Sequence, residues 1–342
     1  MRIPLLSWLF LIPILVNFFG IYMVLASGQC QRDQQSLLLQ MKNSLTFNSS
    51  LSVRLVQWSP GTDCCTWSGV DCDVAGHVIG LNLSLESISG GIENSTGLFG
   101  LQYLQRLNLA FNSFNSAQIP PRFANLTNLK YLNLSNAGFA GQIPIGISDM
   151  TRLVTLDLST IPFKGGDHVL NLENPNLSML VQNLSELREL YLDGVNISAH
   201  GNEWCQALSS SLPNLQVLSL IYSFLSGPIN SSLVNLQSLS VIRLDWNNLS
   251  SPVPEFLAGF PNLISLSLSN CGLYGKIPKK LFQVPTIQTL DLSSNELHQS
   301  SLPEFPQNLS LWTLILTETN FSGIIPDSIG NLKNLSRIEL VF

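Results

Sequence analysis

Apolar residues recur at a fixed spacing through the second half of the chain. Four segments share a pattern in which leucine or isoleucine alternates with polar residues: LSVIRLDWNNL, LISLSLSNCGL, IQTLDLSSNEL and LWTLILTETNF. Their central apolar residues are Ile242, Leu266, Leu290 and Leu314, which are separated by equal intervals of 24 residues. Alternation over so few residues predicts, in each segment, one short strand with one buried face.

A repeat of this length with an L-x-x-L-x-L core is typical of leucine-rich repeats. One such unit cannot bury its own leucine face, so the units stack and their strands form a parallel sheet along the inner wall of a curved solenoid. We therefore predict a leucine-rich-repeat solenoid of the α/β horseshoe class, with about eleven repeats over residues 74–342 and irregular insertions near 159–183 and 196–211. The other central positions in this register are Leu81, Leu107, Leu132, Leu156, Leu190, Leu218 and Ile338.

The segments that follow several strands contain Ile-Pro pairs. These pairs start at Ile119, Ile143, Ile277 and Ile325, and a glycine precedes three of them in the form GxIP. Glycine permits tight turns, and proline fixes φ and lacks a backbone donor. We expect return segments that are irregular or polyproline-like rather than long helices, as in the plant extracellular type of the repeat, which this motif resembles.

Composition and the first residues indicate an exported chain. Only 11% of the 342 residues are charged, the net charge is −6 and there is no basic run, so neither nucleic acid nor an anionic membrane surface is expected as a partner. An apolar run from Ile3 to Leu25 leads into Ala26-Ser27-Gly28, which predicts a signal peptide over residues 1–28. An uncleaved membrane anchor is the alternative, because the run is long enough to span a bilayer.

Residues 29–73 form a separate cysteine-rich unit. Cys30, Cys64, Cys65 and Cys72 predict two disulfides in an exported chain, and because Cys64 and Cys65 are adjacent, two pairings remain open. A zinc site is disfavoured because no C-x-x-C occurs, so we expect no metal and no cofactor. Apolar residues at helical spacing after Asp33 predict a capped amphipathic helix that covers the first strand.

Fixed residues in this unit support a resemblance: Cys30-x-x-Asp33, Trp58, Cys64-Cys65-x-Trp67-x-Gly69-Val70-x-Cys72 and Gly76-His77-Val78. They resemble the N-terminal cap of plant leucine-rich-repeat receptor-like proteins and receptor kinases. Longer stretches, such as SGGIENSTGLFGLQYLQRLNLA from Ser89 and NLTNLKYLNLSNAGFAGQIP from Asn125, are similar to the Verticillium-wilt-resistance class. The chain would correspond to the N-terminal part of such an ectodomain.

The resemblance implies a cell-surface immune receptor that binds an extracellular pathogen-derived protein or peptide and acts in plant defence. Such receptors lack a kinase and rely on an adaptor receptor kinase and a co-receptor kinase, joined through C-terminal repeats and a membrane segment. Because the sequence stops at Phe342 within a predicted strand, we expect a longer receptor on the outer side of the plasma membrane, or a truncated product secreted to the apoplast.

A soluble secreted binder is the alternative function. Plant polygalacturonase inhibitors have a similar cap and about ten such repeats, and inner-face residues there block a fungal cell-wall-degrading enzyme. A truncated decoy that binds without signalling is a related alternative. These functions differ from the receptor at the C-terminus, where an independent secreted protein needs a capping segment.

Thirteen N-x-S/T sequons occur, and an exported chain would present them for glycosylation. Asn82 and Asn133 lie in predicted strands on the inner face, so we expect no glycan there. The remaining expected acceptors are Asn48, Asn94, Asn125, Asn176, Asn183, Asn196, Asn230, Asn248, Asn308, Asn320 and Asn334.

Two cysteines lie outside the first unit. Cys271 occupies the repeat position that holds Asn112, Asn247 and Asn295 elsewhere, which predicts a buried thiol in a ladder of turn residues. Cys205 lies in the inserted segment. The related class tends to carry a cysteine at the position of Ser223, so a disulfide expected from the resemblance is missing here.

The sequence contains no recognisable catalytic constellation. Its four histidines are scattered, no H-E-x-x-H, G-x-S-x-G or phosphate-loop pattern occurs, and Asp157 and Asp291 recur at the repeat period; we therefore predict that the chain is not an enzyme. Larger polar and aromatic residues gather instead on three successive predicted strands, where they would form one concave patch about 10 Å wide. This predicted ligand-binding patch contains Glu189, Tyr191, Asp193, Ile221, Tyr222, Arg243, Asp245 and Trp246.

Overall fold

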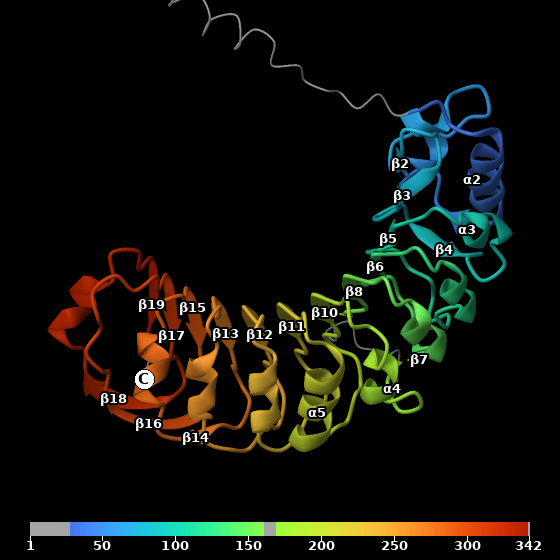
Figure 1. Cartoon of the computed structure of the whole chain (residues 1–342). Helices are drawn as coiled ribbons and strands as arrows, with labels where there is room; N and C mark the ends of the chain where they lie inside the picture. The colour runs from blue at the N-terminus through green and yellow to red at the C-terminus, as the bar shows by residue number, and fades with distance from the viewer. Residues whose placement is uncertain (1–27, 161–168, 341–342) are drawn as a thin grey trace, which may run out of the picture.

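The computed structural model describes residues 28–160 and 169–340. The predicted signal peptide therefore lies outside the described residues except for Gly28, and so does the segment 161–168 of the first insertion. The described chain forms a curved solenoid in which a long sheet lines the inner side of the arc (Figure 1). No helix among the described residues has the length and apolar character needed to cross a membrane.

The long sheet contains one strand from each repeat. These strands are parallel and in register, so that the central leucine of one strand pairs with the central leucine or isoleucine of the next. All eleven predicted central residues lie in these strands, which confirms the predicted sheet. The strands are β3 (Val78–Asn82), β5 (Arg106–Asn108), β6 (Tyr131–Asn133), β8 (Thr155–Asp157), β10 (Glu189–Tyr191), β11 (Val217–Ser219), β12 (Val241–Arg243), β13 (Ser265–Ser267), β15 (Thr289–Asp291), β17 (Thr313–Ile315) and β19 (Arg337–Glu339).

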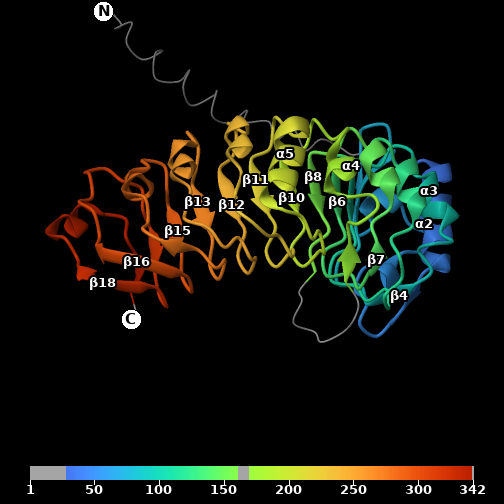
Figure 2. The ribbon, with the colours of Figure 1, turned by 90° about the horizontal axis from the view of Figure 1, so that it is seen from below.

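The return segments lie on the outer side of the arc (Figure 2). After several of the Ile-Pro pairs the chain makes one short 3-10 helix, and the proline lies at its N-cap; examples are η3 (Pro121–Asn125), η4 (Ile145–Asp149) and η7 (Lys279–Gln283). Other 3-10 helices are η5 (Ser231–Asn235), η6 (Glu255–Gly259) and η8 (Asp327–Asn331). The insertion near 196–211 contains a longer α-helix, α5 (Gly201–Ser211), and the one near 159–183 contains α4 (Leu177–Val181).

Short strands also pair between return segments. β7 (Gly141–Gln142) pairs with β9 (Leu170–Asn171), and β14 (Tyr274–Gly275), β16 (Glu296–Ser301) and β18 (Asn320–Ile324) form a second parallel group. Gly141 and Gly275 both have positive φ, at 83° and 80°, which explains why the GxIP motif places glycine there. These pairs link neighbouring repeats on the outer side as the main sheet does on the inner side.

Buried asparagines connect the repeats behind the main sheet. The amide of Asn247 donates to the carbonyl oxygens of Leu220 and Leu244, each at 2.7 Å, and its oxygen accepts from the N–H groups of Ser223 and Leu225. Asn112 and Asn295 make the same kind of contacts in their repeats. This ladder of residues, five positions after each central leucine, satisfies turn groups that would otherwise be buried without partners.

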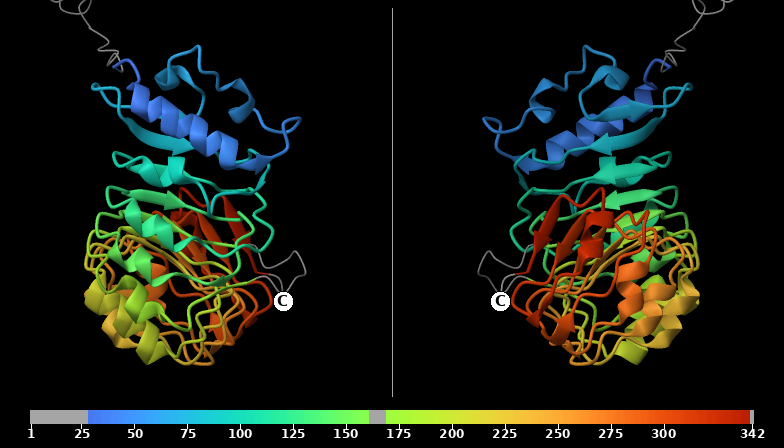
Figure 3. Two further views of the ribbon diagram at one scale, coloured as in Figure 1. Left: turned by 90° about the vertical axis from the view of Figure 1, so that its right-hand side faces the viewer. Right: turned by 90° about the vertical axis from the view of Figure 1, so that its left-hand side faces the viewer.

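The cap covers the N-terminal end of the sheet. Its main helix, α2 (Arg32–Ser44), lies across that end (Figure 3) and buries Leu38 and Met41. Gln31 occupies the N-cap without a side-chain bond, so the expectation that Asp33 caps this helix was wrong; Asp33 lies in the first turn, where a negative charge favours the helix N-terminus. The remaining elements are β1 (Thr46–Phe47), η1 (Leu55–Gln57), η2 (Cys64–Thr66), β2 (Val70–Cys72), β4 (Ile88–Gly90) and α3 (Thr96–Gly100).

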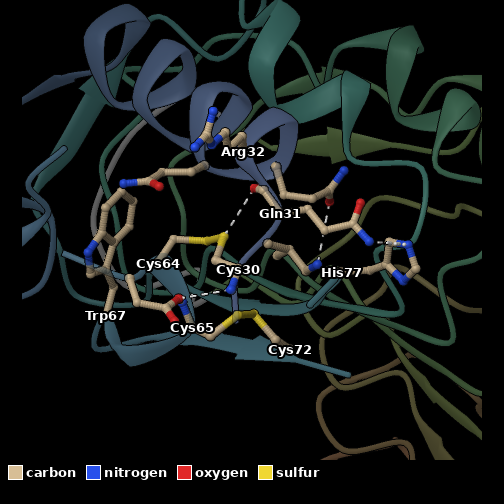
Figure 4. Close-up of a disulfide and its surroundings, with 12 residues drawn as sticks. Cys30, Gln31, Arg32, Cys64, Cys65, Trp67, Cys72 and His77 are labelled. Atoms are coloured by element: carbon tan, nitrogen blue, oxygen red, sulfur yellow. Dashed lines mark hydrogen bonds between the residues drawn. A yellow bond between two sulfur atoms is a disulfide. The ribbon is translucent and has the colours of Figure 1, made fainter. Parts of the chain in front are cut away.

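Two disulfides hold the cap together (Figure 4). They join Cys30 to Cys64 and Cys65 to Cys72, which decides between the two pairings that the sequence left open. The carboxylate of Asp63 accepts from the backbone N–H groups of Cys30 and Cys65 at 3.0 and 2.9 Å, so one side chain aligns both halves of the double bridge. The bonded sulfurs are the atoms that a zinc site would have required.

Glu86 links the cap to the first repeat. It occupies the ladder position of that repeat and is 1% exposed. Its carboxylate accepts from the hydroxyl of Ser52, from the backbone N–H groups of Arg54 and Leu55, and from the Arg54 guanidinium at 3.2 Å. A carboxylate at this position thus binds the cap segment, whereas an asparagine in other repeats binds the turn of the preceding repeat.

We expect replacement of Glu86 to loosen the cap without unfolding the repeats. Glu86→Ala leaves the Ser52 hydroxyl and the N–H groups of Arg54 and Leu55 without their acceptor, although the Arg54 guanidinium still donates to the carbonyl of Ser84. It should lower the free energy of local opening of residues 48–58 by about 1–3 kcal/mol for each buried donor left without a partner. Glu86→Gln keeps one side-chain oxygen and should lower it less. Hydrogen exchange of the amides of Arg54 and Leu55 measures the effect; unchanged exchange in the alanine variant would contradict this account.

Candidate binding surface at the centre of the solenoid

The structure brings the three predicted strands of the patch together. β10, β11 and β12 are consecutive neighbours in the sheet, with Tyr191 paired to Ser219 and Ser219 paired to Arg243. Figure 1 shows these strands at the middle of the arc. The predicted residues nevertheless divide into three groups: two aspartates that bond to the neighbouring repeat, a set of side chains on the concave wall, and a set in the turns at its rim.

Asp193 and Asp245 each bond to the neighbouring repeat, and their part in the binding patch stays a prediction. Asp245 is 8% exposed, and its Oδ1 accepts from the hydroxyl of Ser267 and from the backbone N–H of Ser269 at 2.8 Å. Asp193 makes the equivalent bonds to Ser219 at 2.7 Å and to the N–H of Ile221 at 2.8 Å. Both carboxylates therefore bind the neighbouring repeat.

The reason lies in the residue that ends each strand. Asp157 and Asp291 end their strands and accept from the backbone N–H of Ser159 and Ser293 in their own turns, both at 3.0 Å. Ser219 and Ser267 occupy the same strand position, and their bonds run to the preceding repeat instead. Where a serine ends the strand, the aspartate of the preceding repeat accepts from the N–H group in the turn that follows. In the repeats of Asp157 and Asp291, the aspartate that ends the strand accepts from this N–H group itself.

Burial changes the acidity of these aspartates. Burial raises the pKa of both Asp193 and Asp245 above the ordinary value, and their hydrogen bonds to serine and to backbone N–H groups oppose that rise. Because a raised pKa means that folding disfavours the ionised form, stability is lost as the pH rises through the folded-state pKa.

The concave wall between these aspartates carries Glu189, Tyr191 and Arg243. Tyr191 is half-buried, and burial, followed by the neighbouring charge of Glu189, raises its pKa. The Glu189 carboxylate accepts from the hydroxyl of Thr155 at 3.1 Å. Arg243 is exposed, and no carboxylate of the described residues lies within ion-pair distance of its guanidinium. The wall therefore offers one cation that is free to bind an anionic group.

The rim beside this wall carries exposed aromatic residues. Tyr222 is 39% exposed and Trp246 is 52% exposed, and the N–H of Tyr222 donates to the carbonyl of Asp245 at 2.8 Å, which places their turns side by side. Phe224, which the sequence analysis missed, is 47% exposed, and its ring lies edge-on to that of Tyr222 with 5.2 Å between centroids. Ile221, which precedes Tyr222 in the chain, is half-buried. We call Tyr222, Phe224 and Trp246 the rim aromatics.

All three rim aromatics have left-handed backbone conformations. Their φ angles are 52°, 57° and 60°. Tyr222 and Trp246 occupy the turn position four residues after the central leucine or isoleucine, and Phe224 lies two residues further on. At that turn position other repeats have Asn270 or Gly194, which tolerate positive φ better. Leu85 and Phe111 form a second exposed apolar pair at this position near the cap. A bulky residue there costs on the order of 1 kcal/mol of strain without gaining burial.

The two remaining cysteines are buried thiols. Cys271 occupies the ladder, as predicted: its thiol donates to the carbonyl of Leu244 at 3.1 Å and its N–H donates to Asn295. Cys205 lies on α5 and accepts from the N–H of Asn230 at 3.3 Å, while Ser223 donates to the carbonyl of Leu192. Burial raises the pKa of each thiol to about 12, so neither is a reactive thiolate at neutral pH.

Most predicted glycan acceptors lie on the surface. Asn196 and Asn230 are half-buried, and the other nine of the expected acceptors are exposed. Asn82 is exposed as well, whereas Asn133 donates to the hydroxyl of Tyr131 on the concave wall. Their occupancy stays a prediction.

Comparison with known proteins supplies the family. A family model described as "Leucine rich repeat N-terminal domain" matches residues 32–73, and one described as "Leucine Rich Repeat" matches five segments between 103 and 332. "Receptor-like protein 6" of Arabidopsis thaliana is 33% identical over 95% of this chain, and "Receptor-like protein Cf-9" of Solanum pimpinellifolium is 32% identical over 50% of it. The chain belongs to the plant leucine-rich-repeat receptor-like proteins. It spans 29% and 21% of the lengths of these two relatives.

Solved structures of the same architecture include hormone receptors. The Arabidopsis receptor kinase HAESA, in complex with the peptide hormone IDA and the co-receptor SERK1, superimposes with a TM-score of 0.70 at 26% identity, covering 91% of this chain and 53% of that one. The ectodomain of GASSHO1/SCHENGEN3 from Arabidopsis thaliana, in complex with CASPARIAN STRIP INTEGRITY FACTOR 2, gives 0.68 at 27% identity, covering 90% and 35%. A plant ice-binding protein gives 0.67 at 25% identity, covering 86% and 89%.

Substitution of Asp245 tests its structural role. Asp245→Ala should lower the free energy of unfolding by about 1–3 kcal/mol for each buried donor left without a partner. Asp245→Asn keeps an acceptor oxygen and removes the buried charge, so its stability relative to the native chain should be higher at pH 7 than at pH 4. Denaturant unfolding at the two pH values measures both effects; equal losses in the two variants would refute the assigned hydrogen bonds.

Proposed function

We propose that this chain is part of the ectodomain of a plant immune receptor and binds an extracellular protein or peptide at the centre of the solenoid. In this proposal the chain is exported and glycosylated, and it acts on the outer side of the plasma membrane. The whole receptor would signal through an adaptor receptor kinase and a co-receptor kinase. The named relatives and the ligand and co-receptor in the HAESA complex support this class of function.

The observation that carries the proposal is the combination of the rim aromatics with a free cation. Tyr222, Phe224 and Trp246 expose apolar rings in a strained conformation, and neither the core nor the hydrogen-bond ladder needs these residues to be large. Exposed aromatic residues and arginine are the types that dominate protein interfaces. Strain that packing does not recover is a feature of functional sites.

The geometry also indicates the form of the ligand. The rim aromatics lie in the turns that follow β11 and β12, whereas Tyr191 and Arg243 lie on the concave wall formed by the strands. A segment that crosses from the rim to the wall would bury aromatic rings at one end and bring a carboxylate to Arg243 at the other. We therefore propose a ligand segment with an apolar residue and an acidic group a few residues apart.

Alanine substitution at this site tests the proposed function. Trp246→Ala and Arg243→Ala should each weaken binding roughly tenfold or more if these residues are hot spots. The probe is the set of protein and peptide fractions from the extracellular fluid of fungus-infected plant tissue, and the readout is the dissociation constant on the immobilised chain for the fraction that binds most tightly.

Trp312→Ala is the matched control. Trp312 is also an exposed tryptophan, at 57%, but it lies immediately before β17 rather than in a turn after a strand. The control should bind as the native chain does. Equal affinity of all four chains for the bound fraction would contradict the site.

A further inference from the structure

A groove on the outer side of the solenoid has no part in the proposed ligand site. It lies beside α4 and α5, which pack against each other on the face opposite the concave wall (Figure 2). Its volume is about 1030 Å³, at the upper end of the range of roughly 300–1,000 Å³ for sites that hold small organic ligands. Its apolar floor includes Leu172, Leu177, Ile197 and Ala207.

Three glycosylation sequons converge on this groove. The hydroxyl residues of the sequons at Asn176, Asn196 and Asn230 are Ser178, Ser198 and Ser232, and all three serines line it. Asn176 lines it as well. These sequons come from three successive return segments, so their meeting is a consequence of the solenoid and is invisible in the linear sequence.

The walls of the groove suit a neutral, oxygen-rich group. None of its described lining residues is Lys, Arg or His, and Glu173 and Glu203 stand among several serines and amides. Two lining residues, Trp204 and Ser232, each have a buried polar atom without a hydrogen-bond partner among the described residues: the indole N–H and the hydroxyl oxygen. An apolar floor with a few polar groups matches a sugar ring, which has an apolar C–H face and oxygen acceptors.

Asn176 is the acceptor best placed to supply such a group. Its side chain is exposed, and its Oδ1 accepts from the N–H of Met179 at 3.0 Å. Nδ2, the atom that carries an N-glycan, has no hydrogen-bond partner among the described residues. Asn196 and Asn230 are half-buried, and Asn196 also binds neighbouring backbone groups through its own N–H and carbonyl.

We propose that the groove beside α4 and α5 seats the first sugars of an N-glycan on Asn176. The glycan packs against the lining of the groove, beside the two unpartnered polar atoms, and so serves as part of the outer wall of the solenoid. This inference rests on the export and glycosylation in the proposed function, but it is independent of the proposed ligand site, because the groove and the rim aromatics lie on different faces.

The test compares release of the glycan under native and denaturing conditions. The full chain is secreted from plant cells, and glycopeptide mass spectrometry follows its cleavage by a peptide N-glycosidase. On the native chain, release from Asn176 should be at least roughly tenfold slower than release from the exposed Asn94, because cleavage waits for the glycan to leave the groove. After denaturation the two rates should be equal.

Two pairs of variants complete the test. Ser178→Thr keeps the sequon and should behave as the native chain, whereas Ser178→Ala removes it and should eliminate the Asn176 glycopeptide. Gln206→Trp places a large side chain at an exposed lining position and should raise native release from Asn176 to the Asn94 rate without changing occupancy; Gln206→Ala should not. An unoccupied Asn176, or equal native rates at Asn176 and Asn94, would overturn the proposal.

Discussion

The structure depends on the in-register stacking of short parallel strands. Each strand pairs its central leucine with the leucine or isoleucine of the next repeat, and the turn that follows donates its N–H groups to carbonyls of that same repeat. Buried asparagines such as Asn247 bond the groups that the strands leave unpaired. Each repeat supplies hydrogen-bond partners to the next. A different side chain at one position therefore changes a contact between two repeats and leaves the fold unchanged.

The same stacking forces the rim into a left-handed turn. Nine described residues at that turn position, from Leu85 to Glu318, have positive φ, so the backbone there is fixed by the repeat and the side chain is free to vary. Where the side chain is Asn or Gly, the turn is unstrained. Where it is Tyr222 or Trp246, strain and exposed apolar area occur together, as they do at Leu85 and Phe111 near the cap. At the centre of the solenoid this combination lies beside the exposed Arg243.

The sequence predicted the parts of the structure that follow from its period. The eleven central residues, from Leu81 to Ile338, each lie in a strand as expected. The bonds of Cys271 confirm its predicted place in the ladder. The pairing of Cys30 with Cys64 needed the folded cap. The bonds of Asp193 and Asp245 to Ser219 and Ser267 could not be predicted, because alternation predicts which way a side chain points but not the serine that it meets one repeat later. Phe224 was missed because it lies beyond the strand, although an aromatic residue in a polar turn is a signal that the sequence contains.

The central claim is that a ligand covers the rim aromatics above Arg243. Hydroxyl-radical footprinting of the chain, alone and with the extracellular fraction that it binds, tests this most directly, because oxidation reports the exposure of each aromatic side chain. The account predicts strong protection of Tyr222, Phe224 and Trp246 in the complex, with Trp312 and Tyr274 oxidised as in the free chain. Unchanged oxidation of the rim aromatics, with protection elsewhere on the solenoid, would contradict it.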